Sequence, residues 1–537
     1  MSITLLLQNI KIPLSRASGR DYDAEACDAA RIRLKKQGIQ PIALSVSKRS
    51  VDARRKNAIV YLYSVAAEVD LFPDVRILSE LSAVLLDKAC YEPILGDAPL
   101  SARPCVVGFG PAGMFCALVL AEHGYMPIVL ERGDGIAARE RAYRRFVEEG
   151  ILDTESNIQF GAGGAGTFSD GKLVTRKNDP LCAYVLERLV EFGAPKAILT
   201  NAKPHIGTDI LKRVVENIAL RITSLGGEIR YRSRVKEILP KPSGILLVTD
   251  SDTVAAGACI LAIGHSARDT YEHLYTSGHT LSAKAFSIGF RVEHLANDID
   301  EAMYGDFAPF LPHAEYSLSH REGERGVYSF CMCPGGEVVA AASEPFSVVT
   351  NGMSESRRDG KNDNAALCVS VLPEDYGATP MGAIAYQRRL EKAAYSLARS
   401  AGGEEYAAPF MTVGDLLTGK SGTKYTKVVP SYRGGKVVPC DLSTLLTSDQ
   451  LSLFTNGMRR FGKTIRGFDA PFATLTGIET RTSAPLRILR GEACESVSMP
   501  YLYPCGEGAG YAGGITSAAL DGLRVAASVM ARFKPLQ

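Results

Sequence analysis

The chain has 537 residues, which is too long for one hydrophobic core and predicts roughly two to four domains. Hydrophobic residues make up 46% and charged residues 22%, as in ordinary globular proteins, and no window approaches ~18 consecutive apolar residues, so we predict no membrane span. The net charge of +2 argues against a protein whose overall charge attracts nucleic acid.

The first residues and the cysteines indicate a cytoplasmic protein. The first basic residue, Lys11, comes after the short apolar run at the start, so the sequence does not predict a secretory signal. The 12 cysteines include no C-x-x-C pair, which argues against a zinc ribbon or a thioredoxin-like motif, and we predict no metal site. Several, such as Cys105, Cys116 and Cys259, lie in apolar segments, where a free thiol packs as a small hydrophobic group in a reducing compartment.

Residues 1–95 are predicted to form a separate N-terminal domain. The pattern indicates, in this order, a strand, a helix, two strands and a second helix, over residues 3–12, 24–37, 41–46, 58–69 and 77–90. This order is typical of a small ferredoxin-like α/β domain. The polar, proline-containing residues 96–104 are predicted to be a linker.

The N-terminal domain is locally basic. Residues 1–60 contain 12 Lys and Arg against 5 Asp and Glu. The densest cluster comprises Lys48, Arg49, Arg54, Arg55 and Lys56. A solvated surface is the simpler interpretation, and a face that binds a polyanion is the alternative.

Residues 104–133 have the pattern of a dinucleotide-binding β-α-β unit. Gly108, Gly110 and Gly113 form a G-x-G-x-x-G array between two apolar strands, and Pro111 and Ala112 begin the helix that follows. In this motif the first glycine allows the turn, the second lets backbone approach a pyrophosphate, and the third lets helix and strand pack closely. The helix N-terminus offers free N–H groups to phosphate.

An acidic residue closes the same unit. Glu131 follows Gly113 by 18 residues, at the end of the second strand, where a carboxylate can accept hydrogen bonds from a ribose. The next residue, Arg132, is predicted to contact the cofactor as well.

The glycine pattern occurs twice more, at Gly161–Gly166 and at Gly508–Gly513, without two flanking apolar strands. Residues 157–172 are rich in glycine and hydroxyl groups, which is typical of a backbone nest around an anion. A plain flexible loop is the alternative. We expect cofactor contact here from Gly163, Gly164, Thr167, Ser169 and Asp170.

The middle of the chain contains another buried strand and then a change of pattern. The apolar residues 258–263 end at Gly264, where the main chain can pass close to a cofactor, and at His265, which is more simply interpreted as a loop residue. From residue 286 to 470, β-rich stretches alternate with helices and show no nucleotide signature. We assign this segment to substrate binding and to covering the cofactor.

The end of the chain repeats the strand, glycine loop and helix order. A strand at 501–505 leads into the loop Gly506–Gly514 and a helix that begins at Ile515. An ordinary NAD domain is built from consecutive β-α units and does not require a second glycine loop at the end of the chain. Two helix N-termini from opposite ends of the chain, placed around one long ligand, suit FAD better than NAD.

Several segments resemble known flavoproteins. VVGFGPAGMFCALVLAEHGYMPIVLERG, CILAIGHSA and LYPCGEGAGYAGGITSAALDG look like the glutathione-reductase-type FAD fold. FGAGGAGTFSDGKLVTR, VYSFCMCPGGEVV, VVTNGMSESRRDGKN and ETRTSAPLRI resemble a largely uncharacterised family of bacterial FAD-dependent dehydrogenases. The resemblance implies an α/β fold in which a Rossmann-like FAD-binding domain (100–285 and 471–537) carries an inserted mixed α+β substrate domain (286–470), after the N-terminal domain.

The resemblance also assigns cofactor roles. It places the ADP half of FAD against Gly108, Gly110, Gly113 and Glu131, with Val235 facing the adenine. It places Glu507 near the ribityl and pyrophosphate region, and Gly513, Gly514 and Ile515 at the flavin pyrimidine edge. A helix N-terminus there stabilises negative charge on the reduced flavin.

We therefore predict an FAD-dependent oxidoreductase that moves a hydride between flavin N5 and a small substrate, together with an external electron donor or acceptor. An anionic substrate is one of the options. The candidate catalytic residues are Cys331, Cys333, Arg357, Tyr432 and Arg481. Arg481 is suited to a carboxylate, although it and the two cysteines have a purely structural alternative. The absence of C-x-x-C argues against a disulfide reductase, and the absence of a second complete β-α-β fingerprint argues against a dedicated NAD(P)H domain.

Two other functions stay open at this point. One is a flavoprotein whose basic N-terminal domain binds RNA or a protein partner for modification or sensing. The other is a protein in which FAD is purely structural. The sequence does not identify the oligomeric state or an acid or base.

Overall fold

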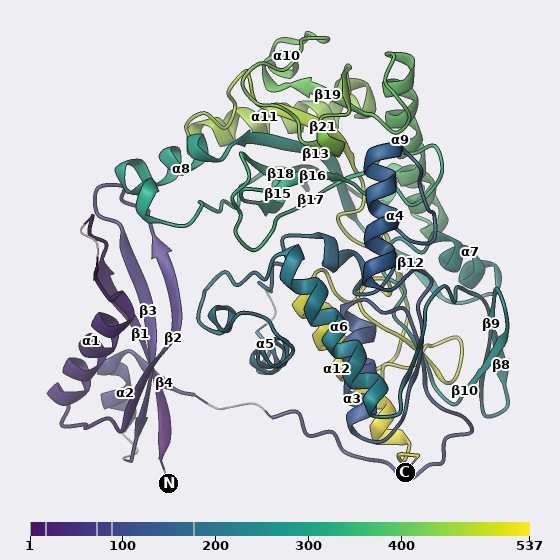
Figure 1. Ribbon diagram of the computed structural model, residues 1–537, viewed down its shortest axis with the longest axis horizontal. Helices are drawn as coiled ribbons and strands as arrows, with labels where there is room; N and C mark the ends of the chain where they lie inside the picture. Colours follow the sequence, from purple (N-terminus) through teal and green to yellow (C-terminus); the bar gives the residue numbers. More distant parts are fainter. Residues whose placement is uncertain (1, 17–18, 71–73, 87–89, 176–177, 537) are drawn as a thin grey trace.

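The computed structural model describes residues 2–16, 19–70, 74–86, 90–175 and 178–536. Its first ninety residues fold around an antiparallel sheet that stands at the left of Figure 1, in the strand order β2-β3-β1-β4. Leu5 and Leu7 of β1 face helix α1 and are buried, because every second side chain of a strand points to the same face. A register shift between Leu7 and Ile10 brings Ile10 to the same buried face. The elements are β1 (Ile3–Pro13), α1 (Tyr22–Lys36), β2 (Ala43–Asp52), β3 (Val60–Val69), α2 (Val75–Leu81) and β4 (Ala83–Leu85).

One prediction for this part of the chain was wrong. The helix predicted over 77–90 ends at Leu81, because Ser82 adopts a left-handed φ of 50°, and Ala83–Leu85 then pairs with β1 as a fourth strand. Residues 87–89 of that prediction lie outside the described residues. The predicted linker 96–104 packs against the end of the chain, where Gly96 N–H donates to the Met530 carbonyl at 2.7 Å.

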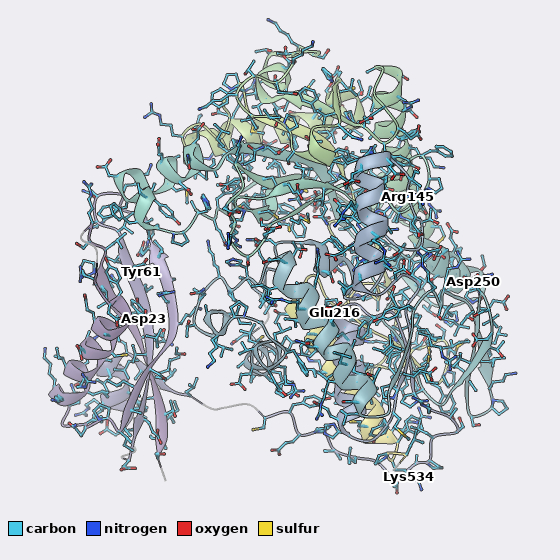
Figure 2. All side chains as sticks on the ribbon, viewed as in Figure 1. Asp23, Tyr61, Arg145, Glu216, Asp250 and Lys534 are labelled. Carbon is cyan, nitrogen blue, oxygen red and sulfur yellow. The ribbon has the colours of Figure 1, made fainter. Side chains whose placement is uncertain are left out.

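The N-terminal unit docks on the remainder of the chain through the edge strand β2. The Arg49 backbone donates to Thr200 O at 2.7 Å and accepts from Ala202 N at 2.8 Å. The Arg49 guanidinium also contacts Asp23, which is labelled in Figure 2, at 3.3 Å. Arg54 pairs with Asp52 at 2.8 Å, so two cations of the basic cluster already have partners within the chain.

A five-stranded parallel sheet of order β23-β11-β5-β6-β7 forms the centre of the molecule. Val106 packs toward a layer of helices, whereas its neighbours Cys105 and Val107 pack toward a three-stranded antiparallel sheet and α7 on the other face. The strands are β5 (Cys105–Val107), β6 (Ile128–Leu130), β7 (Glu228–Arg230), β11 (Cys259–Leu261) and β23 (Leu502–Pro504), and the covering sheet is β8 (Val235–Lys241), β9 (Gly244–Thr249) and β10 (Thr253–Ala256).

Helices α3 (Pro111–Glu122) and α12 (Ile515–Arg532) lie side by side on the first face, with α6 (Thr208–Ser224) next to them (Figure 1). Their axes approach closely because Gly522 has no side chain. A Cβ at position 522 would lie 2.2 Å from the Ala112 carbonyl oxygen. Since α3 begins near residue 111 and α12 near residue 515, the contact holds two helix N-termini from opposite ends of the chain together.

A seven-stranded sheet forms the upper part of the molecule in Figure 1, in the order β14-β15-β18-β13-β21-β19-β20. It includes β21, which lies beyond the predicted end of the inserted segment at 470, so that boundary was too early. The strands are β13 (Phe286–Leu295), β14 (Ser319–Glu322), β15 (Arg325–Cys333), β18 (Asn362–Val371), β19 (Ala408–Thr412), β20 (Val437–Pro439) and β21 (Thr474–Glu479).

Helices cover this sheet, and two small ribbons border it. The longest helix, α9, carries the buried side chains Ile384, Gln387 and Glu391 toward the centre of the molecule. Every helix in the described ranges is too short or too polar to cross a membrane. The remaining elements are α4 (Ile136–Glu149), α5 (Leu181–Glu191), α7 (Arg268–Thr276), α8 (Ala296–Tyr304), α9 (Pro380–Ser400), α10 (Val413–Thr418), α11 (Ser448–Thr464), β12 (Leu281–Ala283) with β22 (Leu486–Ile488), and β16 (Glu337–Ala340) with β17 (Thr350–Met353).

A buried ionic network joins the parallel sheet to the seven-stranded sheet. Glu391, with no exposed surface, accepts hydrogen bonds from Arg268 at 2.6 Å and from Arg481 at 3.0 Å. Burial alone would raise the pKa of Glu391, but the two guanidinium groups lower it well below its usual range. Arg268 begins α7 and Arg481 follows β21, so one carboxylate fixes elements of both sheets.

The close packing of α3 on α12 can be tested by whether the substitution Gly522→Ala stabilises or destabilises the protein. Replacing an interior helical glycine with alanine normally stabilises a helix by about 0.5–1 kcal/mol. For Gly522→Ala we expect the opposite, a loss of about 1–3 kcal/mol, because the new methyl group would overlap the Ala112 carbonyl. Urea unfolding measures the change, and a stabilised variant would show that the helices are further apart.

Candidate functional site: a dinucleotide pocket

One elongated pocket of about 330 Å³ lies where strands β5, β6 and β11 end. Both glycine loops line it, the first with Gly108 and Gly110 and the last with Gly513 and Gly514. The far wall of the pocket is formed by the seven-stranded sheet and the segments next to it, with Phe330, Cys331, Asn351 and Glu479. The pocket therefore begins at a dinucleotide motif and ends against the inserted segment.

The three glycines of the first motif have different tasks. Gly108 adopts a φ of +99°, which permits the turn, and a Cβ at Gly113 would lie 2.0 Å from the Gly108 carbonyl oxygen. Gly110 has an unrestricted backbone, with φ −79°, and lines the pocket as the N-cap of α3 without a side-chain cap. Gly113 is absent from the lining, so it secures the packing of helix on strand, and its predicted cofactor contact is corrected to this indirect role.

Glu131 binds backbone in the structure as well as lining the pocket. Its carboxylate accepts hydrogen bonds from the N–H groups of Phe109 at 2.8 Å and of Gly133 and Gly161 at 2.9 Å. It thereby ties the first glycine turn to the second glycine-rich loop. The neighbouring Arg132 stacks on the Phe160 ring at 4.0 Å and pairs with Glu155 and Asp269.

The second glycine-rich loop is held from below by Arg139 of α4. This buried guanidinium donates to the carbonyl groups of Asn157, Ile158 and Ala162, and burial lowers its pKa to about 9. Gly164 of the loop reaches the pocket.

Two predicted contacts of the same loop are structural instead. A Cβ at Gly163 would lie 2.0 Å from the Thr167 hydroxyl, and that hydroxyl donates to the Ala162 carbonyl at 3.2 Å. Neither Gly163 nor Thr167 lines the pocket. Their predicted cofactor contact is therefore corrected to a role in shaping the loop.

Asp170 and Lys172 lie at the end of this loop and line the pocket as an ion pair of 2.8 Å. Asp170 also accepts from Arg358 Nε at 2.9 Å, and Arg358 bonds Glu315. The predicted catalytic residue Arg357 is exposed and does not line the pocket. Arg358, which has a left-handed φ of 53°, turns its side chain inward to Asp170, but it does not line the pocket either.

The last glycine loop presents an open helix end. Positions Gly513 and Gly514 have no atom within 4 Å of an added Cβ, and α12 begins at Gly514 without a side-chain cap. Glu507 projects into the pocket, and burial raises its pKa to about 7 although Lys284 acts in the opposite direction. Gly506 does not line the pocket. A Cβ there would lie 2.6 Å from Ala112 Cβ, so its predicted cofactor contact is corrected to a packing role.

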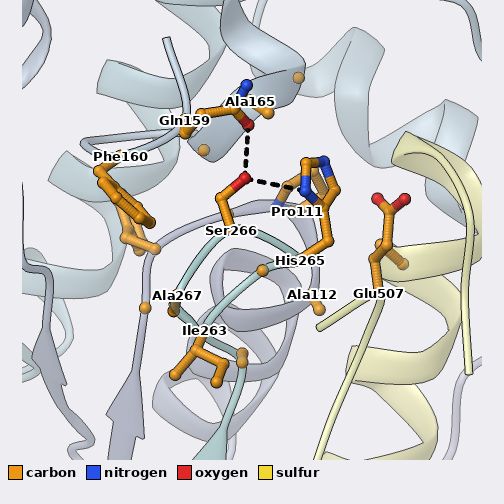
Figure 3. Close-up of a pocket in the computed structure, with 18 of the residues that line it drawn as sticks. Pro111, Ala112, Gln159, Phe160, Ala165, Ile263, His265, Ser266, Ala267 and Glu507 are labelled. Carbon is orange, nitrogen blue, oxygen red and sulfur yellow. Dashed lines mark hydrogen bonds between the residues drawn. The ribbon is translucent and has the colours of Figure 1, made fainter. Parts of the chain in front are cut away.

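His265 and Ser266 follow strand β11 and form a polar bridge across the pocket to Gln159 (Figure 3). Ser266 Oγ donates to Gln159 Oε1 at 3.1 Å and lies 2.9 Å from His265 Nδ1. Because the hydroxyl has one hydrogen, His265 Nδ1 carries the imidazole proton and Nε2 keeps a free lone pair. Burial and the nearby Arg481 and Arg268 lower the pKa of His265 to about 3, so the ring is neutral near pH 7.

The far wall is organised by a second buried arginine. Arg291 of β13 has no exposed surface and donates to both carboxylate oxygens of Glu479. It also donates to Asn351 at 2.8 Å, to Asn364 at 3.1 Å and to the Cys331 carbonyl at 2.8 Å. These contacts use all five N–H groups of the guanidinium. Asn351, Glu479 and Cys331 in turn line the pocket.

Two further catalytic predictions need correction. Tyr432 is fully buried in the core of the seven-stranded sheet, where its hydroxyl bonds Tyr406 O at 3.3 Å, and it does not reach the pocket. Arg481 does line the pocket, but its guanidinium bonds Glu391 and Ser343, which supports the bracing alternative over anion binding. Cys331 lines the pocket and Cys333 lies buried behind it.

The structure thus brings most predicted cofactor residues to one pocket. Those in the lining are Gly108, Gly110, Pro111, Ala112, Glu131, Arg132, Gly164, Ser169, Asp170, Val235, Gly264, Glu507, Gly513, Gly514 and Ile515. Lining residues that the prediction did not include are Gln159, Phe160, Lys172, His265, Ser266, Asn351 and Glu479. His265, Asn351 and Glu479 all lie within segments that carry the family resemblance, but no residue pattern there indicated their individual roles. Within the described ranges, no group of three or more His, Cys, Asp or Glu is arranged to hold a metal ion.

These features define a dinucleotide-binding flavoprotein. Two uncapped helix N-termini, an open backbone at Gly110, Gly513 and Gly514, and a lining that continues between them fit FAD, with its pyrophosphate at the first loop and its ring at the last. Residues 285–482 match the family model described as "FAD-dependent protein, C-terminal domain-like". The cofactor of this protein is FAD.

A relative covers almost the whole chain. An uncharacterized protein of Clostridium beijerinckii is 45% identical over 504 residues, which is 91% of this chain and 92% of the relative. The chain belongs to the same family as this relative, a family of FAD-dependent proteins.

Solved structures show weaker likeness. CtdE in complex with FAD is 13% identical, with a TM-score of 0.31 over 79% of this chain and 82% of that chain. The amino acid oxidase NikD is 13% identical, with a TM-score of 0.31 over 81% and 98%. Thioredoxin reductase of Lactococcus lactis is 16% identical, with a TM-score of 0.18 over 30% of this chain and 36% of that chain. TM-scores this low do not establish a common fold.

The different tasks of Gly110 and Gly113 can be separated by the same substitution. An alanine methyl at Gly110 meets Gly164 Cα at 3.8 Å, an ordinary contact, but it occupies the place where backbone must approach the pyrophosphate. We expect Gly110→Ala to keep its stability and to weaken FAD binding by about tenfold or more. Gly113→Ala should instead lower the stability of the flavin-free protein, by about 1–3 kcal/mol. Flavin content and thermal unfolding of both variants measure the two effects.

Glu507 leads to a prediction about pH. A carboxyl whose pKa is raised from 4.5 to about 7 binds more protons when folded, so stability falls as the pH rises through this interval. Glu507→Gln removes that loss. In the flavin-free protein we expect the variant to match the wild type near pH 5 and to exceed it at pH 8 by about 1–3 kcal/mol. Urea unfolding across this range is the measurement, and parallel curves would contradict the raised pKa.

Proposed function

We propose that this chain is an FAD-dependent oxidoreductase that moves a hydride between flavin N5 and a small substrate held against the seven-stranded sheet. The observation that supports it is the continuity of the pocket, whose lining runs from the dinucleotide cradle to Cys331, Asn351 and Glu479 of the inserted segment. Bound FAD supplies the two-electron chemistry. The chain supplies binding, orientation and charge.

Two titratable side chains that follow strands of the parallel sheet are uncharged or only partly charged near pH 7. His265 is neutral and offers Nε2 as a hydrogen-bond acceptor, while Glu507 takes up a proton near neutral pH. The N-terminus of α12 offers N–H groups and the positive end of its dipole, which stabilises negative charge at this end of the pocket.

The substrate class follows from how the cations are used. Arg481 and Arg291 bond carboxylates and carbonyl groups within the chain, and Lys172 pairs with Asp170. Arg481 and Lys172, which line the pocket, therefore already face acidic partners within the chain, and this weakens the case for the anionic substrate that the sequence suggests. We favour a small uncharged substrate, together with an external electron donor or acceptor.

The finer architecture belongs to this proposal. We assign residues 1–95 to a ferredoxin-like domain, and residues 100–285 with 483–537 to a glutathione-reductase-type FAD domain. The inserted substrate domain is then 286–482, because β21 belongs to its sheet. The buried cysteines of the described residues, such as Cys105, Cys116 and Cys259, are thiols without a disulfide partner, which favours a reducing cytoplasm as the compartment. The alternative role of the basic N-terminal surface in binding RNA loses support, since Arg49 and Arg54 already have partners in the chain.

The cofactor and the redox role are tested together. We expect purified protein to be yellow, to release FAD on denaturation, and to lose its flavin absorbance on anaerobic reduction. Anaerobic titration with uncharged and anionic candidate metabolites then tests the substrate class. A colourless protein that cannot be reconstituted with FAD would contradict the cofactor, and a bound flavin that no physiological donor reduces would contradict the enzyme.

A further inference from the structure

Two cysteines lie at an irregularity of strand β15, next to the pocket. Phe330 pairs with Ala366 of β18 and Cys333 with Asn364, so two residues of β15 stand opposite one residue of β18. Cys331 is one of the two, and its left-handed φ of 43° is unusual for a residue with a side chain. A bulge of this kind redirects side chains, and bulges are over-represented next to active sites.

The bulge places one thiol in front of the other. Cys331 is partly exposed and lines the pocket, whereas Cys333 has no exposed surface. The Cys333 thiol donates to the Cys331 carbonyl oxygen at 3.4 Å. The two cysteines are therefore neighbours at the bulge, with Cys331 at the pocket and the Cys333 thiol buried against the Cys331 backbone.

Charges around the pair favour the thiolate of Cys331. The hydrogen bond from Cys333, and then the cations Arg291 and Lys172, lower the pKa of Cys331 to about 6, while the same interaction and burial raise that of Cys333. Burial instead raises the thiol pKa of Cys116, Cys259, Cys440 and other described cysteines. The thiolate is the nucleophile in thiol–disulfide exchange, and an accessible low-pKa cysteine beside a second thiol is typical of redox cysteines.

We propose that Cys331 and Cys333 form a reversible dithiol–disulfide pair on the substrate side of the pocket, and that the substrate is a small disulfide. This rests on the proposed function for the reduced FAD, but it changes the route of the electrons. They pass from FAD to the cysteine pair and from the pair to the substrate, in place of a direct hydride transfer to the substrate. The pair is compatible with the absence of C-x-x-C, because the bulge brings together two cysteines that are separated by one residue.

The exchange balances without any further reactant. The Cys331 thiolate attacks one sulfur of the disulfide, forms a mixed disulfide and releases the first thiolate. Cys333 loses its proton and attacks the Cys331 sulfur, which forms the Cys331–Cys333 bond and releases the second thiolate. One disulfide has become two thiols, and the pair has lost two electrons and two protons. Two electrons and two protons restore the dithiol, and the reduced FAD of the proposed function is their source.

The test uses the FAD-loaded full chain and 2-hydroxyethyl disulfide under anaerobic conditions. After acid quenching, free thiols are alkylated and the tryptic peptide 326–357, which contains both cysteines and no other, is weighed. We expect this peptide to carry no alkyl group and to weigh two hydrogen atoms less than the unalkylated dithiol peptide. A peptide that stays fully alkylated while the exposed Cys90 is modified would overturn the proposal.

Single variants separate the two roles. Cys333→Ser should trap the hydroxyethylthio group on Cys331, because no second thiol is present to release it. Cys331→Ser should leave Cys333 unmodified, since Cys333 is buried. The control Cys440→Ser, which lies outside the pocket lining, should behave as the wild type does. An adduct on Cys333 in the Cys331→Ser variant would overturn the assigned order, and the wild-type peptide mass decides if a variant does not fold.

Flavin absorbance of the same sample distinguishes the two proposals. Formation of the disulfide in a protein without FAD would support the pair and contradict the proposed function. A reducible bound FAD beside two cysteines that never couple would support the proposed function and contradict the pair.

Discussion

The close contact of α3 with α12 is the constraint on which the rest of the structure depends. Ala112 lies near both Gly522 and Gly506, and at either glycine an added Cβ would overlap it. The contact aligns the starts of two helices that are separated by some four hundred residues. Each start has free N–H groups, so the fold produces one pocket with two positive helix ends. A ligand with a phosphate group near one end and an electron-accepting ring at the other matches this distribution.

The buried ionic networks then determine what the pocket offers to a substrate. Taking arginine into a protein interior is costly unless its hydrogen-bonding groups are satisfied. Glu391 satisfies Arg268 and Arg481, and the second network, around Arg291, uses every N–H of that guanidinium. These cations fix the relative positions of the two sheets. Since the guanidinium groups of Arg268, Arg481 and Arg291 all bond carboxylates within the chain, they contribute field and geometry to the pocket.

Local patterns in the sequence predicted the parts of the site that are local in the structure. The β-α-β unit around Gly108 and Glu131, and the helix after Gly514, depend on residues within some thirty positions, and their periodicity and glycine spacing are visible in the sequence. A strand begins at Phe286, where the sequence shows the change of pattern.

The parts that were missed depend on contacts distant in sequence or on single backbone angles. The sequence pattern predicted Gly163 to be part of an anion-binding nest. In the structure a side chain at this position would overlap the Thr167 hydroxyl, which explains the glycine. Arg357 and Arg358 are indistinguishable by residue type, and one left-handed φ selects which of them turns inward. Tyr432 lies in a loop whose burial is set by the seven-stranded sheet. Pairing of the short strand Ala83–Leu85 likewise requires β1, which lies some eighty residues earlier.

At the bulge around Cys331, the buried Arg291 acts both on the backbone and on the charge of the thiol. Arg291 lies on β13, which is separated from β15 by β18, and it reaches the Cys331 carbonyl across that strand. The same guanidinium carries the positive charge that stabilises a thiolate at Cys331, so the group that holds the irregular backbone also tunes the side chain that the irregularity exposes. Strained non-glycine residues persist where the surroundings over-determine them. Here one hydrogen bond from Arg291 holds the Cys331 carbonyl, while the other four fix the guanidinium itself, so the one described cysteine with a lowered pKa is held at the wall of the FAD pocket.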